Sequence, residues 1–107
     1  MEFEKSKIFD LAEAVSYSGD ATVSKMVLKK QTGNITLFAF DAGQSLSEHS
    51  APFDAYVLVT EGKGKIIINR TGYDLSAGQF IVMPANIPHA VQAVERFKMM
   101  LVMIKGA

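Results

Sequence analysis

Short apolar runs separated by turn-forming residues fill the chain from Thr22 onward. Seven of them are rich in β-branched, aromatic or methionine residues and read TVSKMVLKK, NITLFAFD, YVLVTEG, KIIINR, FIVMP, HAVQAV and FKMMLVMIK. Runs of this length and composition are typical of β-strands. Glycine, proline and asparagine recur between them at intervals of about eight to twelve residues, which favours a sandwich or a closed barrel. The pattern predicts an all-β fold.

The segment before these runs carries a short predicted helix. In DLAEAV, Asp10 is placed to cap the helix and Glu13 follows three residues later, as in a capping box. Two glycine-containing stretches further along the chain predict hairpin turns. In the first, from Asn69 to Gly72, we expect Gly72 to take the left-handed conformation that closes a type I turn. The second is EGKGK, which spans residues 61–65.

Several predicted strands carry apolar residues on both faces, among them IIIN, FIVM and MMLVMI. Both faces of such strands have to be covered, one by the barrel interior and the other by a second layer or another subunit. A chain of 107 residues has the size of a single domain and little left over for a second layer. We therefore expect one domain over residues 1–107 that forms a homodimer.

Composition excludes several classes of function. Lysine plus arginine equals aspartate plus glutamate, at 11 each, so no basic face is predicted that would bind nucleic acid. The charged start, MEFEKSKIFD, lacks the apolar core of a signal peptide, and no apolar run is long enough to span a bilayer. Because cysteine is absent, disulfides, thiolate metal sites and cysteine nucleophiles are excluded. We expect a cytoplasmic protein with neither nucleic-acid nor membrane partners.

The chain has two histidines, and each stands in a segment framed by glycine. Five positions of the first segment keep the spacing of the motif G(x)5HxH(x)3-4E(x)6G, namely Gly43, His49, Ala51, Ala55 and Gly62. Five positions of the second follow G(x)5PxG(x)2H(x)3N, namely Gly78, Pro84, Asn86, His89 and Ala93. The two motifs and the spacer between them resemble those of the cupin superfamily. The resemblance implies a double-stranded β-helix, a jelly-roll-like barrel, over residues 22–105, preceded here by the short helix.

The same resemblance implies where a metal ion would bind. In metal-binding cupins, three histidines and one glutamate hold the ion. Here His49 and His89 keep two of the ligand positions, whereas Ala51 and Ala55 stand at the other two and cannot coordinate a metal. A divalent ion on both histidines would need a further ligand, such as Gln44, Glu48 or Asp54. We therefore expect no cofactor, with a divalent metal on the two histidines as the alternative.

The residues around the first histidine also predict a pocket. Strand alternation places His49, Ala51, Ala55 and Val57 on one face, and the resemblance implies that this face looks into the barrel. The two alanines would widen the interior there. Together with His89, these residues predict a mostly apolar pocket that carries two titratable groups. We expect this pocket to bind a small organic molecule.

Two classes of function fit such a pocket. The first is a binding or sensing module without catalysis. The second is a small enzyme of the isomerase, epimerase or dioxygenase type, either metal-dependent through an incomplete site or metal-free with the histidines as acid and base. No carboxylate stands at an inward position beside either histidine, and a base without an orienting partner is a poor catalyst. The sequence therefore favours the binding module, and it identifies neither a catalytic residue nor the ligand.

Overall fold

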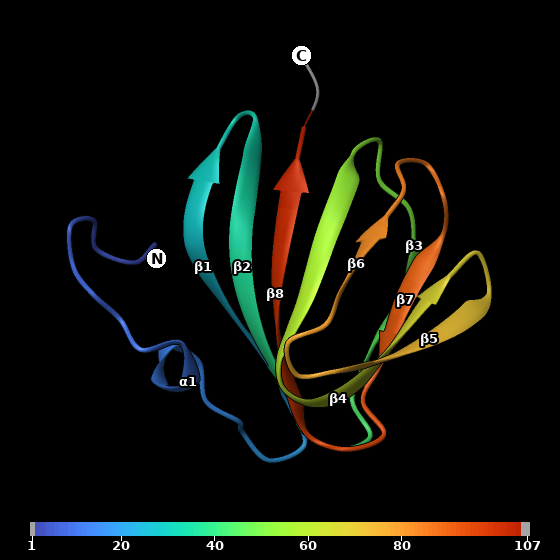
Figure 1. Cartoon of the computed structure of the whole chain (residues 1–107), viewed down its shortest axis with the longest axis horizontal. Helices are drawn as coiled ribbons and strands as arrows, with labels where there is room; N and C mark the ends of the chain where they lie inside the picture. Colours follow the sequence, from blue (N-terminus) through green and yellow to red (C-terminus); the bar gives the residue numbers. More distant parts are fainter. Residues whose placement is uncertain (1, 106–107) are drawn as a thin grey trace.

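The computed structural model describes residues 2–105 of the chain (Figure 1). Within this range lie one short helix and eight strands. Their bounds are Leu11–Ala14 for α1, Thr22–Lys30 for β1, Gly33–Phe40 for β2, Ser45–His49 for β3, Asp54–Ile68 for β4, Thr71–Ser76 for β5, Phe80–Met83 for β6, His89–Gln92 for β7 and Phe97–Ile104 for β8.

The strands form an antiparallel sheet that curls into two opposed sides. Sheet A contains β1, β2, β8, the first part of β4 and β6, whereas sheet B contains β3, β7, the last part of β4 and β5. In Figure 1, β4 bends from one side to the other at the base of the barrel, and the strands spread apart toward the opposite end. This arrangement confirms the predicted all-β, double-stranded β-helix barrel with one short N-terminal helix.

The strand β4 joins the two sheets without a break, and the hairpin turn predicted over residues 61–65 is wrong. Its pairing with β8 shifts register between Val59 and Glu61, and Gly62 has a φ of 74°, so the strand bends there without ending. A Cβ atom on Gly64 would overlap the ring of Phe97, which is fully buried. The two glycines therefore allow a bulge and a close packing contact inside one continuous strand.

Asn69 and Arg70 close the hairpin between β4 and β5. Ile68 pairs with Thr71 across the turn, and the two loop residues have positive φ angles of 49° and 67°. Positive φ at both central positions defines a type I′ turn, whose twist matches that of the flanking strands. The prediction that Gly72 takes the left-handed conformation is therefore wrong, because Gly72 already lies within β5.

The predicted helix forms over a single turn and is held by tertiary contacts. Asp10 occupies its N-cap position, but the side chain of Asp10 makes no capping hydrogen bond, so that part of the prediction is wrong. The first turn is closed by the backbone, with the N–H of Glu13 donating to the carbonyl oxygen of Asp10 at 3.0 Å. Directly after the helix, Val15 is buried against Leu37 and Ala39 of β2. The N-terminal segment thus covers part of the outer face of sheet A.

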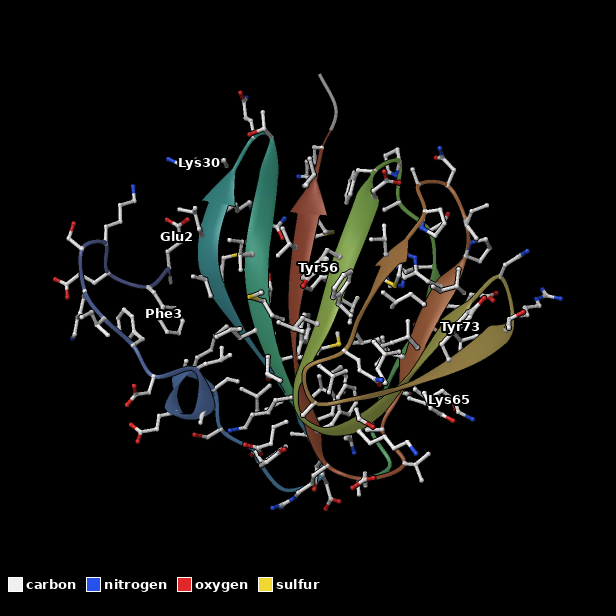
Figure 2. All side chains as sticks on the ribbon, in the orientation of Figure 1. Glu2, Phe3, Lys30, Tyr56, Lys65 and Tyr73 are labelled. Carbon is white, nitrogen blue, oxygen red and sulfur yellow. The ribbon has the colours of Figure 1, made fainter. Side chains whose placement is uncertain are left out.

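A second part of that outer face is apolar and lies at the surface. Tyr56 of β4, Phe80 and Val82 of β6 and Ile104 of β8 share it, and we call these four residues the outer strip. Tyr56 lies over β4 in Figure 2, and its ring meets that of Phe80 at a centroid distance of 4.9 Å. Phe80, Val82 and Ile104 are each more than half exposed, at 61%, 51% and 66%. At the outer strip, the apolar positions of these strands are therefore covered on the inside only.

The interior between the sheets holds the main core. Its largest fully buried side chains include Phe40, Phe97 and Ile66, and the two phenylalanine rings stack with centroids 4.7 Å apart. The large side chains of this cluster fill the barrel near the bend of β4. Ala55, which also belongs to the cluster, stands near the start of the same strand and has a small side chain. No helix among the described residues has the length and apolar character required to cross a membrane.

Candidate functional site

His49 and His89 face each other on adjacent strands of sheet B. His49 is the last residue of β3, His89 is the first of β7, and the strand register pairs the two directly. Their Nε2 atoms lie 3.2 Å apart, and the rings meet edge to face at an interplanar angle of 69°. His89 is buried, whereas His49 is exposed. Two imidazoles 40 residues apart in the sequence therefore form one polar unit.

The turn before β7 fixes where His89 enters the barrel. Asn86 has a positive φ of 64°, and its backbone N–H donates to the carbonyl oxygen of Ala51 at 2.7 Å. The carbonyl oxygen of Pro88 accepts a hydrogen bond of 2.8 Å from the N–H of Asn69. The chain that leads to His89 is thus tied on one side to the segment after β3 and on the other to the hairpin after β4.

The hydrogen positions on the two rings follow from their partners. Nδ1 of His49 lies 2.9 Å from the carbonyl oxygen of Ser47, and because a carbonyl oxygen can only accept, this nitrogen carries the hydrogen. The Nε2 atom of a neutral His49 is then a bare acceptor. For the 3.2 Å contact to be a hydrogen bond, His89 must supply the donor, so we assign it the tautomer with a hydrogen on Nε2. The Nδ1 atom of His89 is buried and has no partner at hydrogen-bonding geometry.

The surroundings of His89 disfavour its charged form. Burial lowers the pKa of His89 below its ordinary value of 6.5, and the neighbouring imidazole of His49 lowers it further. The backbone of Ile87 acts in the opposite direction and has the smallest effect of the three. With both rings neutral, the two facing nitrogens share one hydrogen.

The histidine pair stands at a cavity of about 250 Å³ inside the barrel. The remaining lining is apolar and comes from both sheets: Phe38, Leu46, Ala51, Phe53, Ala55, Met83, Val91, Met99, Leu101 and Met103. Ala55 pairs with Met83 on one side and with Met103 on the other, so the space above its methyl group is bordered by two thioethers. The two imidazoles are the polar side chains of this lining.

Comparison with known proteins identifies the fold family. A family model described as the cupin domain matches residues 36–105. The chain belongs to the cupin family. Among solved structures, this cupin is similar to a conserved protein of unknown function from Streptococcus pyogenes, with 40% identity and a TM-score of 0.93 over 100% of this chain and 94% of the other.

Two further structures are similar to this cupin over different shares of their own length. A cupin 2 conserved barrel domain protein from Leptotrichia buccalis is 42% identical with a TM-score of 0.88, and the match covers 91% of this cupin but 47% of that chain. A salicylate 1,2-dioxygenase from Pseudaminobacter salicylatoxidans matches 80% of this cupin and 27% of its own chain at a TM-score of 0.73. Its identity of 17% shows a shared fold alone. A comparison with curated proteins found no match.

The structure brings most of the residues predicted for the pocket to one cavity, namely His49, Ala51, Ala55 and His89. The predicted alternation along one strand from His49 to Val57 is wrong, because β3 ends at His49 and β4 begins at Asp54. Val57 shares the inward parity of Ala55 on β4 but is not part of the lining. It is fully buried in the core, and its β8 partner Leu101 lines the cavity in its place. That these residues bind a small molecule stays a prediction.

The residues considered as further metal ligands do not reach this cavity: Gln44, Glu48 and Asp54. Glu48 lies 3.9 Å from Arg70 in a surface ion pair, and Asp54 accepts a hydrogen bond of 2.8 Å from the N–H of Ala85. Within residues 2–105, no three histidine, aspartate or glutamate side chains come together as a group that could hold a metal ion. The donors present in this cupin therefore do not fit a site of three histidines and one glutamate.

Sequence reasoning missed the three methionines of the lining, Met83, Met99 and Met103. The run from Met99 to Ile104 is apolar at both parities, so its pattern does not tell which residues face inward. The register of β8 against β4 decides this, by placing Met103 opposite Ala55. Two adjacent strands have to be aligned before these side chains can be assigned to the cavity.

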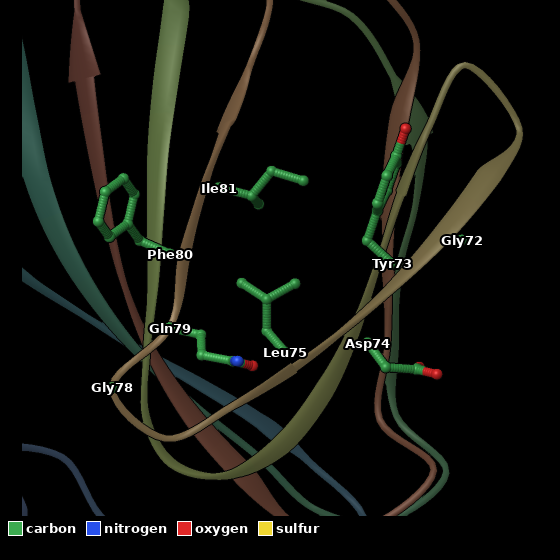
Figure 3. Close-up of a pocket in the computed structure, with 8 residues that line it drawn as sticks. All are labelled: Gly72, Tyr73, Asp74, Leu75, Gly78, Gln79, Phe80 and Ile81. Atoms are coloured by element: carbon green, nitrogen blue, oxygen red, sulfur yellow. The ribbon is translucent and has the colours of Figure 1, made fainter.

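A larger, open hollow lies outside the barrel between β5 and β6 (Figure 3). Leu75 and Ile81 point into the space between the two strands, whereas Phe80 lies on the other side of β6. The lining holds a single charged side chain, Asp74, and it contains neither histidine of this cupin. Tyr73, Asp74 and Gln79 are its polar side chains, and no hydrogen bond joins these three, unlike the imidazole pair of the barrel cavity.

Proposed function

We propose that this cupin is a binding module whose barrel cavity holds a small organic molecule, oriented by His49 and His89. The observation that carries the proposal is the cavity of about 250 Å³, in which apolar side chains surround a single imidazole pair. Ligand sites have this composition, because apolar contact supplies area while a few polar groups fix orientation. The volume lies below the usual range for drug-sized ligands, so the ligand is smaller than these.

The surroundings of the histidines favour binding over catalysis. In the described part of the chain, the cavity lining includes no aspartate or glutamate. Nδ1 of His49 is oriented by the carbonyl oxygen of Ser47, and Nδ1 of His89 has no partner. A catalytic histidine needs a group that orients it and stabilises the imidazolium that forms. An isomerase, epimerase or dioxygenase activity is the alternative.

Methyl NMR tests the proposal with probes that the cavity already contains. Toluene, added up to millimolar concentration to protein labelled at alanine and methionine methyl groups, should give saturable shifts of the probes in the lining, Ala51, Ala55, Met83, Met99 and Met103. Met26 and Met100 serve as internal controls. Met26 contacts Thr36 and Met100 packs against the cluster around Val15, so both should keep their shifts.

A cavity-filling variant provides the matched control. Ala55→Leu places a larger side chain between Met83 and Met103, so the toluene-dependent shifts should disappear while the signals of Met26 and Met100 show that the variant is folded. Such overpacking costs about 1–3 kcal/mol, which a domain of ordinary stability tolerates. Lining methyl groups that neither toluene nor a polar aromatic probe such as phenol shifts, or shifts confined to the two control methionines, contradict the proposed function.

We also propose that two copies of this cupin associate through the outer strip. The strip continues the apolar face that the N-terminal segment covers elsewhere, and its three most exposed side chains are large and apolar. Monomeric proteins rarely leave such a patch in water. A second copy is the occupant we favour, because a self-complementary apolar face is what a two-fold dimer needs. The cytoplasmic location and the absence of nucleic-acid or membrane partners stay predictions from composition.

A further inference from the structure

The imidazole pair presents one acceptor and one donor to the same space. The bare Nε2 of His49 accepts, the Nε2–H of His89 donates, and both lie on the cavity lining. In the structure each satisfies the other at 3.2 Å. A ligand that enters between them therefore has to replace both roles, since a polar group that loses its partner inside the cavity weakens binding.

A single hydroxyl group replaces both roles with one atom. Its oxygen accepts from His89 while its hydrogen is donated to His49. A carboxylate or an ether oxygen only accepts, so it would leave the lone pair of His49 facing another lone pair. An oxygen about 2.8 Å from each nitrogen holds the nitrogens roughly 4.5 Å apart, so the rings must separate by a little more than about 1 Å. His49 is exposed at the end of β3, and it is the ring that can move.

The rest of the cavity suits an aromatic ring. A cavity of about 150 Å³ is enough to bind benzene in a protein core, and this one has about 250 Å³. Its lining contains two phenylalanines and three methionines, whose rings and thioethers make favourable contacts with an aromatic ring: Phe38, Phe53, Met83, Met99 and Met103. The space left beyond one ring allows a few additional atoms.

We propose that the ligand is a small aromatic molecule with one hydroxyl group, which inserts between His49 and His89 while the ring packs against the methionines. The inference rests on the proposed binding function and adds the chemical class of the ligand. The hydroxyl group bridges the two imidazoles, and the order of preference follows from donor and acceptor matching. Phenol fits, anisole and benzoate lose the donor, and toluene offers neither role.

Titrations with these four probes test the inference by the same methyl signals of Ala55 and Met103. Phenol should bind about tenfold more tightly than anisole or benzoate, which corresponds to one additional hydrogen bond. His49→Phe removes the acceptor but keeps an aromatic ring. In that variant the preference for phenol over anisole should disappear, whereas toluene should bind as it does to the parent.

The outcomes separate this inference from the proposed function. If toluene binds in the cavity, and if benzoate or anisole binds as tightly as phenol, the binding function stands. The hydroxyl bridge is then overturned. A preference for phenol that persists in His49→Phe overturns it as well. If none of the four probes shifts the cavity methyl groups, both the binding function and the inference are wrong.

Discussion

The buried ammonium group of Lys98 donates a hydrogen bond of 2.7 Å to the carbonyl oxygen of Ala12, which lies 86 residues earlier in the chain. Lys98 is 6% exposed, and its Nζ lies 3.8 Å from Glu61, whose other oxygen accepts a 2.7 Å hydrogen bond from the hydroxyl of Tyr17. The strand β8 thus contacts the N-terminal segment at Ala12 and β4 contacts it at Tyr17, on either side of the buried Val15.

Loss of this ammonium group should release the N-terminal segment. Lys98→Met keeps the apolar stem and removes the donor, and we expect the free energy of unfolding to fall by about 2 kcal/mol, the usual contribution of a hydrogen bond to a charged group. Hydrogen exchange should lose protection at the amides of Glu13 and Ala21, which donate to Asp10 and Ser18 within the segment. Lys25→Met, on the exposed face of β1, is the control and should change neither quantity. Unchanged exchange in Lys98→Met would contradict the assignment of this role.

The ion pair between Asp41 and Arg96 predicts part of the acid sensitivity. The guanidinium of Arg96, at 2.7 Å, and the N–H groups of Asp20 and Ala42 hold the pKa of Asp41 at about 2, below its ordinary value of 3.8. A carboxyl with a lowered folded-state pKa stabilises the fold above the unfolded-state value, and this contribution disappears as the pH falls from about 3.8 toward about 2. The effect should be small, because the pair lies at the surface.

Urea denaturation of the parent and of Asp41→Asn between pH 2 and pH 6 checks this. The variant should be less stable at pH 6, and the difference between the two proteins should vanish near pH 2. Asp74→Asn, at an exposed position of β5, is the control. A difference between parent and variant that is the same at every pH would show that Asp41 acts through packing and not through its charge.

The proposed dimer predicts that charge on the outer strip separates the copies. Phe80→Glu combined with Val82→Glu puts two carboxylates on β6, and in a two-fold dimer they would face their own copies or apolar residues. Sedimentation at micromolar concentration should show a dimer for the parent and a monomer for the variant. Val94→Glu changes an equally apolar and more exposed residue, at 79%, outside the strip and should stay dimeric. A parent protein that sediments as a monomer would contradict the dimer that we infer from the apolar residues on both faces of the strands.

The sequence predicts the strands that are strongly apolar and misses those that are polar. β3 reads SLSEH and β5 reads TGYDLS, and both lie at the margins of sheet B, where few positions are buried. Their side chains carry no period that would set them apart from loops. The glycines of EGKGK mislead for a related reason. Gly62 and Gly64 permit a bend and a close contact with Phe97, and a turn would need the same residue type.

In the candidate site too, some features follow from the sequence of one segment, whereas others depend on how the strands pair. Motif spacing brings His49 and His89 together, because each stands at a fixed distance from the turns that frame its strand. The hydrogen-bond roles of the two rings depend on Ser47 and on burial, which no spacing reveals. The methionine border of the cavity depends on the register of three strands. Alternation alone puts Val57 in the pocket, whereas the structure fills that position from β8.

Ala51 and Ala55 stand where metal-binding cupins have a histidine and a glutamate, so substitutions at these two positions test whether a metal site can be rebuilt. Nitrogens about 2.0–2.1 Å from one tetrahedral ion lie about 3.4 Å apart, and the Nε2 atoms of His49 and His89 are already at 3.2 Å. Ala51 and Ala55 line the same cavity, whose volume leaves room for larger side chains. The hydrogen bond to Ser47 would hold His49 in the tautomer that a metal requires.

We therefore predict that Ala51→His combined with Ala55→Glu raises the affinity for a divalent ion about a thousandfold or more over the parent, because two added ligands complete a closed site. Calorimetric titration of both proteins with zinc, cobalt or nickel at neutral pH measures the two affinities. Ala51→Phe combined with Ala55→Leu fills the same space without donors and should bind as weakly as the parent. Tight binding of one ion per chain by the unmodified protein would show that the imidazole pair already serves a metal, and the proposal of an organic ligand oriented by His49 and His89 would then fail.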